Sequence, residues 1–86
     1  MIIEICATSL ESITNAQNAG AHRIELCEKY SIGGITPSKE FSIEAFEITK
    51  IPTNVLIRPR GGSFVFTDRE IEIMISQINF FKNFKI

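Results

Sequence analysis

The sequence is short of several features that commonly reveal a class of protein. Among 86 residues it has one histidine, two cysteines and no tryptophan. No run of apolar residues approaches the roughly 18 that a membrane-spanning helix needs. The first residues, Met1 to Glu4, show no basic segment followed by an apolar core. These absences predict a protein with neither a membrane-spanning helix nor a secretory signal.

An excess of charge of either sign is also missing. Nine Lys and Arg face ten Asp and Glu, which gives a net charge of −1. A protein that coats nucleic acid is usually strongly basic, so this balance argues against such a partner. The composition, 44% hydrophobic and 22% charged, is ordinary for one globular domain. Two cysteines in a chain without an export signal are expected to stay reduced.

The hydrophobic pattern alternates between the periods of strands and helices. Segments 2–6, 22–27 and 54–58 are typical of strands. A helix is expected after each: over 8–18, from Thr36-Pro37 to before Pro52, and from Thr67 onward. The last helix has an apolar stripe formed by Ile71, Met74, Ile75, Ile78 and Phe81. The order βαβαβα predicts an α/β fold with parallel strands in the order 1-2-3 and all three helices on one face.

Capping residues mark the expected helix ends. Two pairs fit a capping box: Thr8 with Glu11, and Thr67 with Glu70. Pro37 suits the first position of the second helix, because proline there loses no helical hydrogen bond. Gly20 suits the C-terminal cap of the first helix. The only histidine, His22, opens the second strand, where a structural role is expected.

The predicted strands place different chemistry on their two faces, since side chains alternate with period two. One face is apolar and should take the helices: Ile3, Ile5, Ile24, Leu26, Val55 and Ile57. The other carries Glu4, Cys6, Arg23, Glu25, Cys27, Leu56 and Arg58. Buried charges are unfavourable unless they are paired. Two interpretations stay open: a structural Glu–Arg network inside a barrel, or a ligand-binding site at the carboxyl ends of the strands.

Both cysteines fall on this polar face, each at the end of its strand. Adjacent strands lie about 4.8 Å apart, so thiols at matching heights could share one soft metal ion. Two thiolates suit Cu(I), which accepts few ligands, and are too few for a closed zinc site. In the alternative interpretation, Cys6 and Cys27 are small hydrophobic residues.

Charged residues at the same end of the predicted sheet favour a small anionic ligand. Guanidinium groups pair bidentately with carboxylate or phosphate, and glycines let backbone N–H groups approach an anion. The candidate anion-binding residues are Arg23, Arg58, Arg60, Gly61 and Gly62. The candidate catalytic residues are a carboxylate pair, Glu4 and Glu25. In the alternative interpretation, the arginines hold the loop through stacking or salt bridges.

Taken together, these residues resemble the CutC copper-homeostasis family. The resemblance is carried by short pieces in the order and spacing of that family, among which the run from Ile57 to Gly62 is the most specific. The pieces are Glu4-Ile5-Cys6, Gly20-Ala21, Arg23-Ile24-Glu25-Leu26-Cys27, Gly33-Gly34, Thr36-Pro37-Ser38, and Ile57-Arg58-Pro59-Arg60-Gly61-Gly62 with Phe64, Asp68 and Glu70. His22, Ile32 and Ser63 depart from it, because the family usually has an acidic residue there.

The resemblance implies a TIM barrel and a cytoplasmic protein involved in copper handling. Within the family, the cysteines that match Cys6 and Cys27 are suggested Cu(I) ligands. A complete barrel has about 250 residues and eight βα units, so residues 1–86 are expected to form one partial domain with the first three units, the N-terminal third of the family.

Two functions are therefore expected to compete. One is copper homeostasis, with Cu(I) held by Cys6 and Cys27. The other is an enzyme of the TIM-barrel fold, or an inactive fragment of one, that acts on a small anionic substrate with the Glu pair and the Arg clamp. The open edges of a three-stranded sheet also predict self-association.

Overall fold

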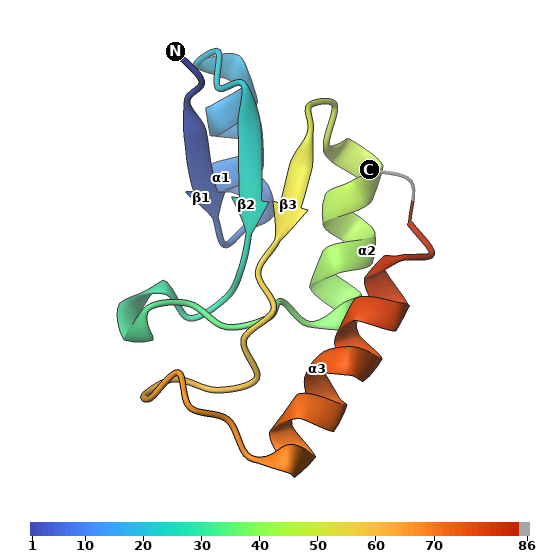
Figure 1. Cartoon of the computed structure of the whole chain (residues 1–86). Helices are drawn as coiled ribbons and strands as arrows, with labels where there is room; N and C mark the ends of the chain where they lie inside the picture. The colour runs from blue at the N-terminus through green and yellow to red at the C-terminus, as the bar shows by residue number, and fades with distance from the viewer. Residues whose placement is uncertain (85–86) are drawn as a thin grey trace.

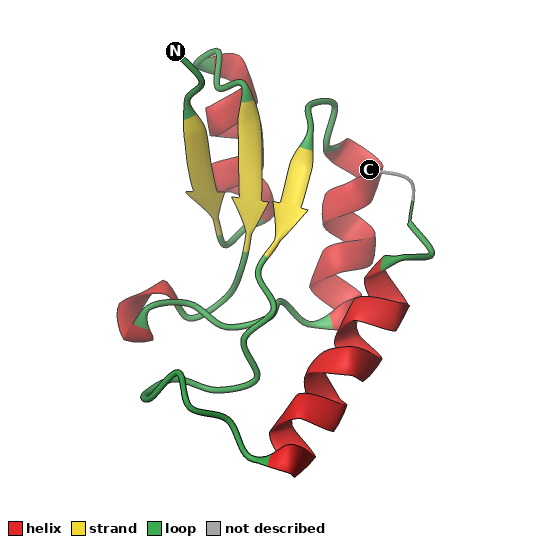
Figure 2. Cartoon of the chain, in the orientation of Figure 1, coloured by secondary structure: helices red, strands yellow, loops and turns green. Residues whose placement is uncertain are grey.

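Three parallel strands form one sheet, in the order β1-β2-β3. The protein is represented by a computed structural model, which describes residues 1–84. Its elements are β1 (Glu4–Ala7), α1 (Leu10–Asn18), β2 (Arg23–Leu26), the short 3-10 helix η1 (Tyr30–Ile32), α2 (Lys39–Ile48), β3 (Thr53–Val55) and α3 (Asp68–Phe81). Figures 1 and 2 show this arrangement. The expected βαβαβα order and parallel pairing are confirmed.

The register confirms which residues share a face of the sheet. Glu4 lies opposite Arg23, and Cys6 lies opposite Glu25. Glu25 in turn lies opposite Asn54 of β3. Paired residues in parallel strands point to the same side, so the polar residues gather on one face. The expected directions of Glu4 and Ile5 are therefore correct.

The core lies between the apolar face and the first two helices. Ile24 and Leu26 of β2 are fully buried there, together with Ile13 of α1 and Ala45 of α2. Figure 2 shows α1 behind the sheet in this view, so the viewer faces the polar side. Burying an Ile or Leu side chain contributes about 1.5–3 kcal/mol. This packing fixes the sheet, and no helix described in residues 1–84 lies over its polar face.

Helix α3 departs from the expected placement on the sheet. It packs along α2, where the rings of Phe46 and Phe81 meet edge to face with centroids 6.2 Å apart. Of its expected apolar stripe only Phe81 is buried, whereas Ile71, Ile75 and Ile78 are exposed. The stripe has the right period, but among residues 1–84 only its C-terminal end at Phe81 is packed against another element. The expectation that all three helices cover the sheet holds for α1 and α2 only.

Local hydrogen bonds explain where the helix boundaries differ from those expected. At α1 the N-cap is Ser9, and its capping box is completed by Ser12 rather than by the expected Thr8 and Glu11. At α2 the N-cap is Ser38, so Pro37 lies before the helix and not at its first position. A serine hydroxyl at each start accepts from a free backbone N–H, which decides the boundary.

Other expected boundaries are confirmed. The capping box of Thr67 and Glu70 begins α3. Gly20, with a φ of +90°, follows the end of α1. His22 has the expected structural role, because its Nδ1 accepts a hydrogen bond from the Ile3 N–H at 2.8 Å. None of the helices described in residues 1–84 combines the length and apolarity needed to cross a bilayer.

Strand β3 is shorter than the expected 54–58. It ends at Val55, although the Leu56 N–H still donates to the Leu26 carbonyl at 3.0 Å. Two residues later, the Arg58 carbonyl accepts from the Thr36 N–H at 2.9 Å. The chain therefore leaves the sheet to pair with the loop after β2, and Arg58 lies in a loop instead of a strand.

Candidate functional site

The polar face of the sheet carries a network centred on Glu4. The Arg23 Nε donates to Glu4 Oε2 at 2.7 Å, and the Asn54 Nδ2 donates to the same oxygen at 2.9 Å. One residue from each of the three strands therefore meets at one carboxylate oxygen. This pairing supports the interpretation of a structural Glu–Arg network, here at the amino ends of the strands.

Asn54 is a member of this network that sequence reasoning missed. The alternation that places Leu56 on the polar face also applies two residues earlier, so the signal was present. Asparagine is uncommon in strands, and the set of polar-face residues expected for segment 54–58 begins only at Leu56. The structure gives it a partner on β1, two strands away.

Cys6 lies at the other end of this face, beside Glu25. Its Sγ donates to Glu25 Oε1 at 3.7 Å across the β1–β2 pair. Desolvation by the surrounding atoms raises the pKa of the Cys6 thiol, and the charge and hydrogen bond of Glu25 raise it further. A thiol with a raised pKa stays protonated at neutral pH, so Cys6 is not an activated nucleophile.

Cys27 follows the end of β2 and is buried, in contrast to the exposed Cys6. Burial raises the pKa of the Cys27 thiol, and the nearby Cys6 adds to this effect. The register corrects one expectation, because Cys6 pairs with Glu25 and Cys27 lies two residues farther along. The two thiols are therefore diagonal neighbours on one face instead of lying at matching heights.

Binding of one ion by both sulfurs would require the two side chains to bridge the spacing of diagonal neighbours. On a sheet face this spacing is roughly 7–8 Å at Cα. Among residues 1–84, no group of three or more His, Cys, Asp or Glu side chains is arranged to hold a metal. The donor set thus suits a soft cation with few ligands, such as Cu(I), and not zinc.

Arg58 joins the loop after β2 to the loop after β3. Its Nη1 donates to the carbonyls of Ile32 at 3.2 Å and Gly34 at 3.1 Å, and its Nη2 donates to the Gly62 carbonyl at 2.8 Å. The side chain is buried, and the Phe64 ring lies 4.6 Å from the guanidinium carbon. Its Nε is buried and has no hydrogen-bond partner among residues 1–84. Arg58 therefore fastens two loops at the carboxyl end of the sheet.

Arg60 is engaged within its own loop and the start of α3. It pairs with both carboxylate oxygens of Glu70 and donates to the carbonyls of Gly61, Ser63 and Val65. The hydrogen bond from Arg60 is the main reason that the pKa of Glu70 falls to about 2. Anion binding by Arg58, Arg60, Gly61 and Gly62 stays a prediction, and for Arg60 it requires these bonds to be exchanged.

Comparison with known proteins shows which family this chain is similar to. A model of the CutC family matches residues 1–86. A CutC family protein of Pasteurella multocida is 45% identical over 82 residues, which are 95% of this chain and 34% of that protein. The human copper homeostasis protein cutC homolog is 47% identical over 81 residues, 94% of this chain and 30% of its own length.

A solved structure agrees with these matches. The crystal structure of a CutC protein from Streptococcus agalactiae superimposes with a TM-score of 0.76 at 38% identity, over 91% of this chain and 39% of that one. That protein has a TIM-barrel-like fold, to which the three βα units described above correspond. The chain spans about a third of the length of the curated relatives that it matches. The match over its whole length shows that this chain belongs to the CutC family.

Proposed function

We propose that this chain acts in cytoplasmic copper homeostasis and binds Cu(I) through the thiolates of Cys6 and Cys27. The observation that carries the proposal is that the two thiols are diagonal neighbours on the polar face, with Cys6 exposed and Cys27 buried. The names of the human and mouse relatives, both copper homeostasis protein cutC homologs, support the copper role. Free thiols suit a reducing compartment.

Copper binding by this pair is coupled to loss of the thiol protons. Both thiols have raised pKa values, so each carries a proton at neutral pH before the ion arrives. The metal ligand is the thiolate, so binding Cu(I) releases these protons and its affinity rises with pH. Glu25 Oε1 already accepts the hydrogen bond of the Cys6 thiol and is the nearest acceptor for its proton.

The test is a competition for Cu(I) between the protein and a chelator that becomes coloured when it binds Cu(I), under reducing, oxygen-free conditions. Cys6→Ser and Cys27→Ser should each abolish chelator-resistant binding, because one thiolate cannot hold the ion against other thiols. Glu25→Gln is the matched control: it removes the charge beside Cys6 and keeps both sulfurs, so binding should persist. Retention of tight binding by either serine variant would disprove the two-thiolate site.

A second function, an enzyme acting on a small anionic substrate, is favoured by a different observation. The buried Nε of Arg58 has no hydrogen-bond partner in the described part of the chain. It lies at the carboxyl end of the strands, where TIM barrels bind their substrates. In this proposal, Arg58 and Arg60 hold the anion and Glu25 exchanges protons, with Glu4 as its carboxylate partner. Arg23 pairs with Glu4 at the amino ends of the strands, so a direct contact of Arg23 with the same anion would require this pair to separate.

The two functions respond to different variants. A screen of small phosphorylated and carboxylated compounds, read by thermal shift, should give a stabilising ligand only if the anion site exists. Loss of that shift in Glu25→Gln, with no effect of Cys6→Ser, would favour the enzyme. The reverse dependence for Cu(I) would favour copper homeostasis.

A further inference from the structure

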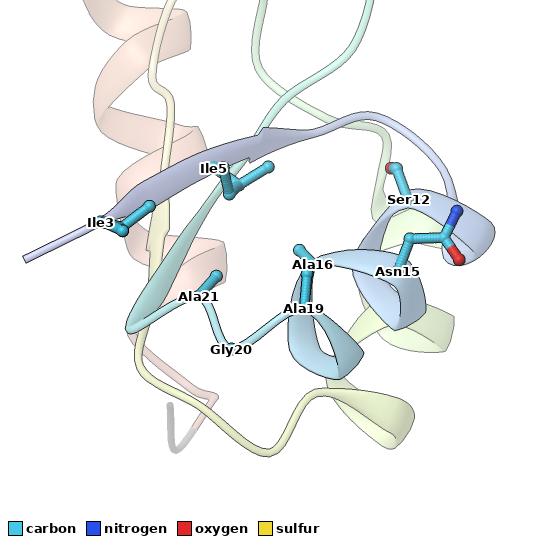
Figure 3. A pocket seen from close by; sticks show the side chains of 8 residues that line it. All are labelled: Ile3, Ile5, Ser12, Asn15, Ala16, Ala19, Gly20 and Ala21. Carbon is cyan, nitrogen blue, oxygen red and sulfur yellow. The ribbon is translucent and has the colours of Figure 1, made fainter.

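An apolar groove follows the outer side of β1. It has a volume of about 360 Å³. It is lined by Ile5 of the strand with Ile3 just before it, and by Ala16 of α1 with Ala19 at the helix C-cap. Figure 3 shows the lining side chains. Ile3 and Ile5 are 45% and 39% exposed, although they lie on the same face as the fully buried Ile24. We call this strand edge and groove the β1 surface.

A second groove lies at the opposite edge of the sheet. It has a volume of about 260 Å³ and is lined by Val55 of β3, by Ile57 just after that strand, and by Ile78 in the C-terminal half of α3. The exposed residues Ile71 and Ile75 extend its apolar lining along the same helix. We call this strand edge, groove and helix stripe the β3 surface.

The two surfaces offer the same pair of binding elements. In the sheet of residues 1–84, β1 and β3 each pair only with β2, so each has a backbone edge free to accept a parallel strand. Beside each edge lies an apolar helix flank. A βα unit presents a strand and an amphipathic helix in this relation, because its crossover places the helix on the face of the sheet.

Two occupants fit these surfaces: a second copy of this chain, or the βα units that the relatives have in addition. Strand number decides between them. An eight-stranded barrel closes with five further strands, whereas copies of a three-stranded sheet supply multiples of three. The solved relative, of which this chain covers 39%, has the same three units within a longer TIM-barrel-like chain.

We propose that the β1 and β3 surfaces together bind the remaining βα units of a CutC barrel when those units are supplied as a separate polypeptide. The complex contains one copy of each chain, because both surfaces are filled by a single partner. Self-association through the same edges is the competing reaction, and the partner displaces it because it covers both surfaces at once.

The experiment co-expresses this chain with the part of the Pasteurella multocida protein that lies outside its 82 matched residues. Purification through a tag on this chain, followed by light scattering after gel filtration, should give a one-to-one complex. Ile5→Glu on the β1 surface and Ile78→Glu on the β3 surface should each lower its yield by at least about tenfold, because burying a charge is strongly unfavourable. Ile43→Glu is the matched control, since Ile43 is 45% exposed on α2 and lines neither groove.

A chimera covers the case in which the separate pieces fail to associate. It joins residues 1–86 covalently to the same part of the Pasteurella multocida protein. If the chimera folds as a monomer while the separate chains do not associate, the proposal is wrong. It is also wrong if the chimera fails to fold, if this chain stays in homo-oligomers beside its partner, or if the complex tolerates both glutamate variants.

Discussion

The thiol of Cys6 and the carboxylate of Glu25 face each other across the β1–β2 pair, with Sγ 3.7 Å from Oε1. This relationship couples the chemistry of the sulfur to the charge of its neighbour. Glu25 raises the pKa of Cys6 both through its negative charge and as the hydrogen-bond acceptor of the protonated thiol. Replacing Glu25 therefore changes a property of Cys6 that can be measured without any metal.

Glu25→Gln should make Cys6 more reactive toward iodoacetamide at neutral pH. Removing the negative charge lowers the thiol pKa, so a larger fraction is present as thiolate, the reactive form. The rate of Cys6 alkylation, followed by mass spectrometry between pH 6 and pH 10, should rise at lower pH than in the parent chain. Glu44→Gln, on the exposed side of α2, is the charge-matched control. An unchanged pH profile in Glu25→Gln would refute the coupling.

Glu70→Gln should lower stability at neutral pH and have less effect in acid. The pKa of Glu70 is lowered to about 2, so its ionised form stabilises the fold at every pH above its ordinary value of 4.5. That contribution is lost as the pH falls through the window between 4.5 and about 2. Urea midpoints at pH 7 and at several points down to pH 2 should therefore converge for the two proteins.

Glutamine can preserve the capping box, so the comparison removes the negative charge and one of the two oxygens that accept from Arg60. Glu72→Gln is the control, because Glu72 and Arg69 form an exposed pair with 3.9 Å between charged atoms. Such exposed pairs contribute little to the free energy of unfolding. If the difference in urea midpoint between Glu70→Gln and the parent chain did not depend on pH, the ionised Glu70 carboxylate would not be the source of the stabilisation.

Arg58→Met should destabilise the protein by about 3 kcal/mol. Methionine keeps much of the buried volume but leaves three backbone carbonyls without their donor. Denaturant unfolding monitored by circular dichroism gives the free energy. Arg69→Met serves as the control at a side chain that is 82% exposed, where a change within about 0.5 kcal/mol is expected. A loss for Arg58→Met no larger than that of the control would mean that the two loops are held in another way.

Gly34→Ala should destabilise more than Gly20→Ala. Both glycines have a positive φ, +87° and +90°, which costs about 1–2 kcal/mol for an alanine. A Cβ at Gly34 would lie 3.0 Å from Leu56 Cδ2, whereas one at Gly20 would meet nothing within 4 Å. The difference between the two melting temperatures measures this contact. Equal melting temperatures would show that Leu56 moves away freely.

The sheet could be predicted from the sequence because its signal is local. Alternation over a few residues places Ile24 and Leu26 on one face and Glu25 on the other, and the register agrees. The environment of α3 could not be predicted in this way. Its 3.6-residue period shows that one side is apolar but does not say what covers that side, which depends on tertiary neighbours.

The site was predictable in composition but less so in geometry. The polar face and its residue types follow from period two, and Glu4 with Arg23 forms the expected pair. The height of one thiol relative to the other depends on strand register. A shift of the register by two residues leaves every side chain on its face, so the alternation in the sequence does not distinguish the two heights. The partners of Arg58 were also beyond sequence reasoning, because they are backbone carbonyls of a loop 24 to 26 residues away.

A single guanidinium group thus has acceptors in both loops at the carboxyl end of the sheet. One consequence concerns how these loops evolve. A Cβ at Gly33 would lie 2.8 Å from Arg58 Nη1, so a side chain at position 33 would displace the guanidinium group. The loop after β3 depends on the same group through its hydrogen bond to the Gly62 carbonyl. Changes at positions 33 and 58 are therefore expected to be tolerated only in combination. Sequence drift in the two loops should be correlated, although they are separated along the chain by a helix and a strand.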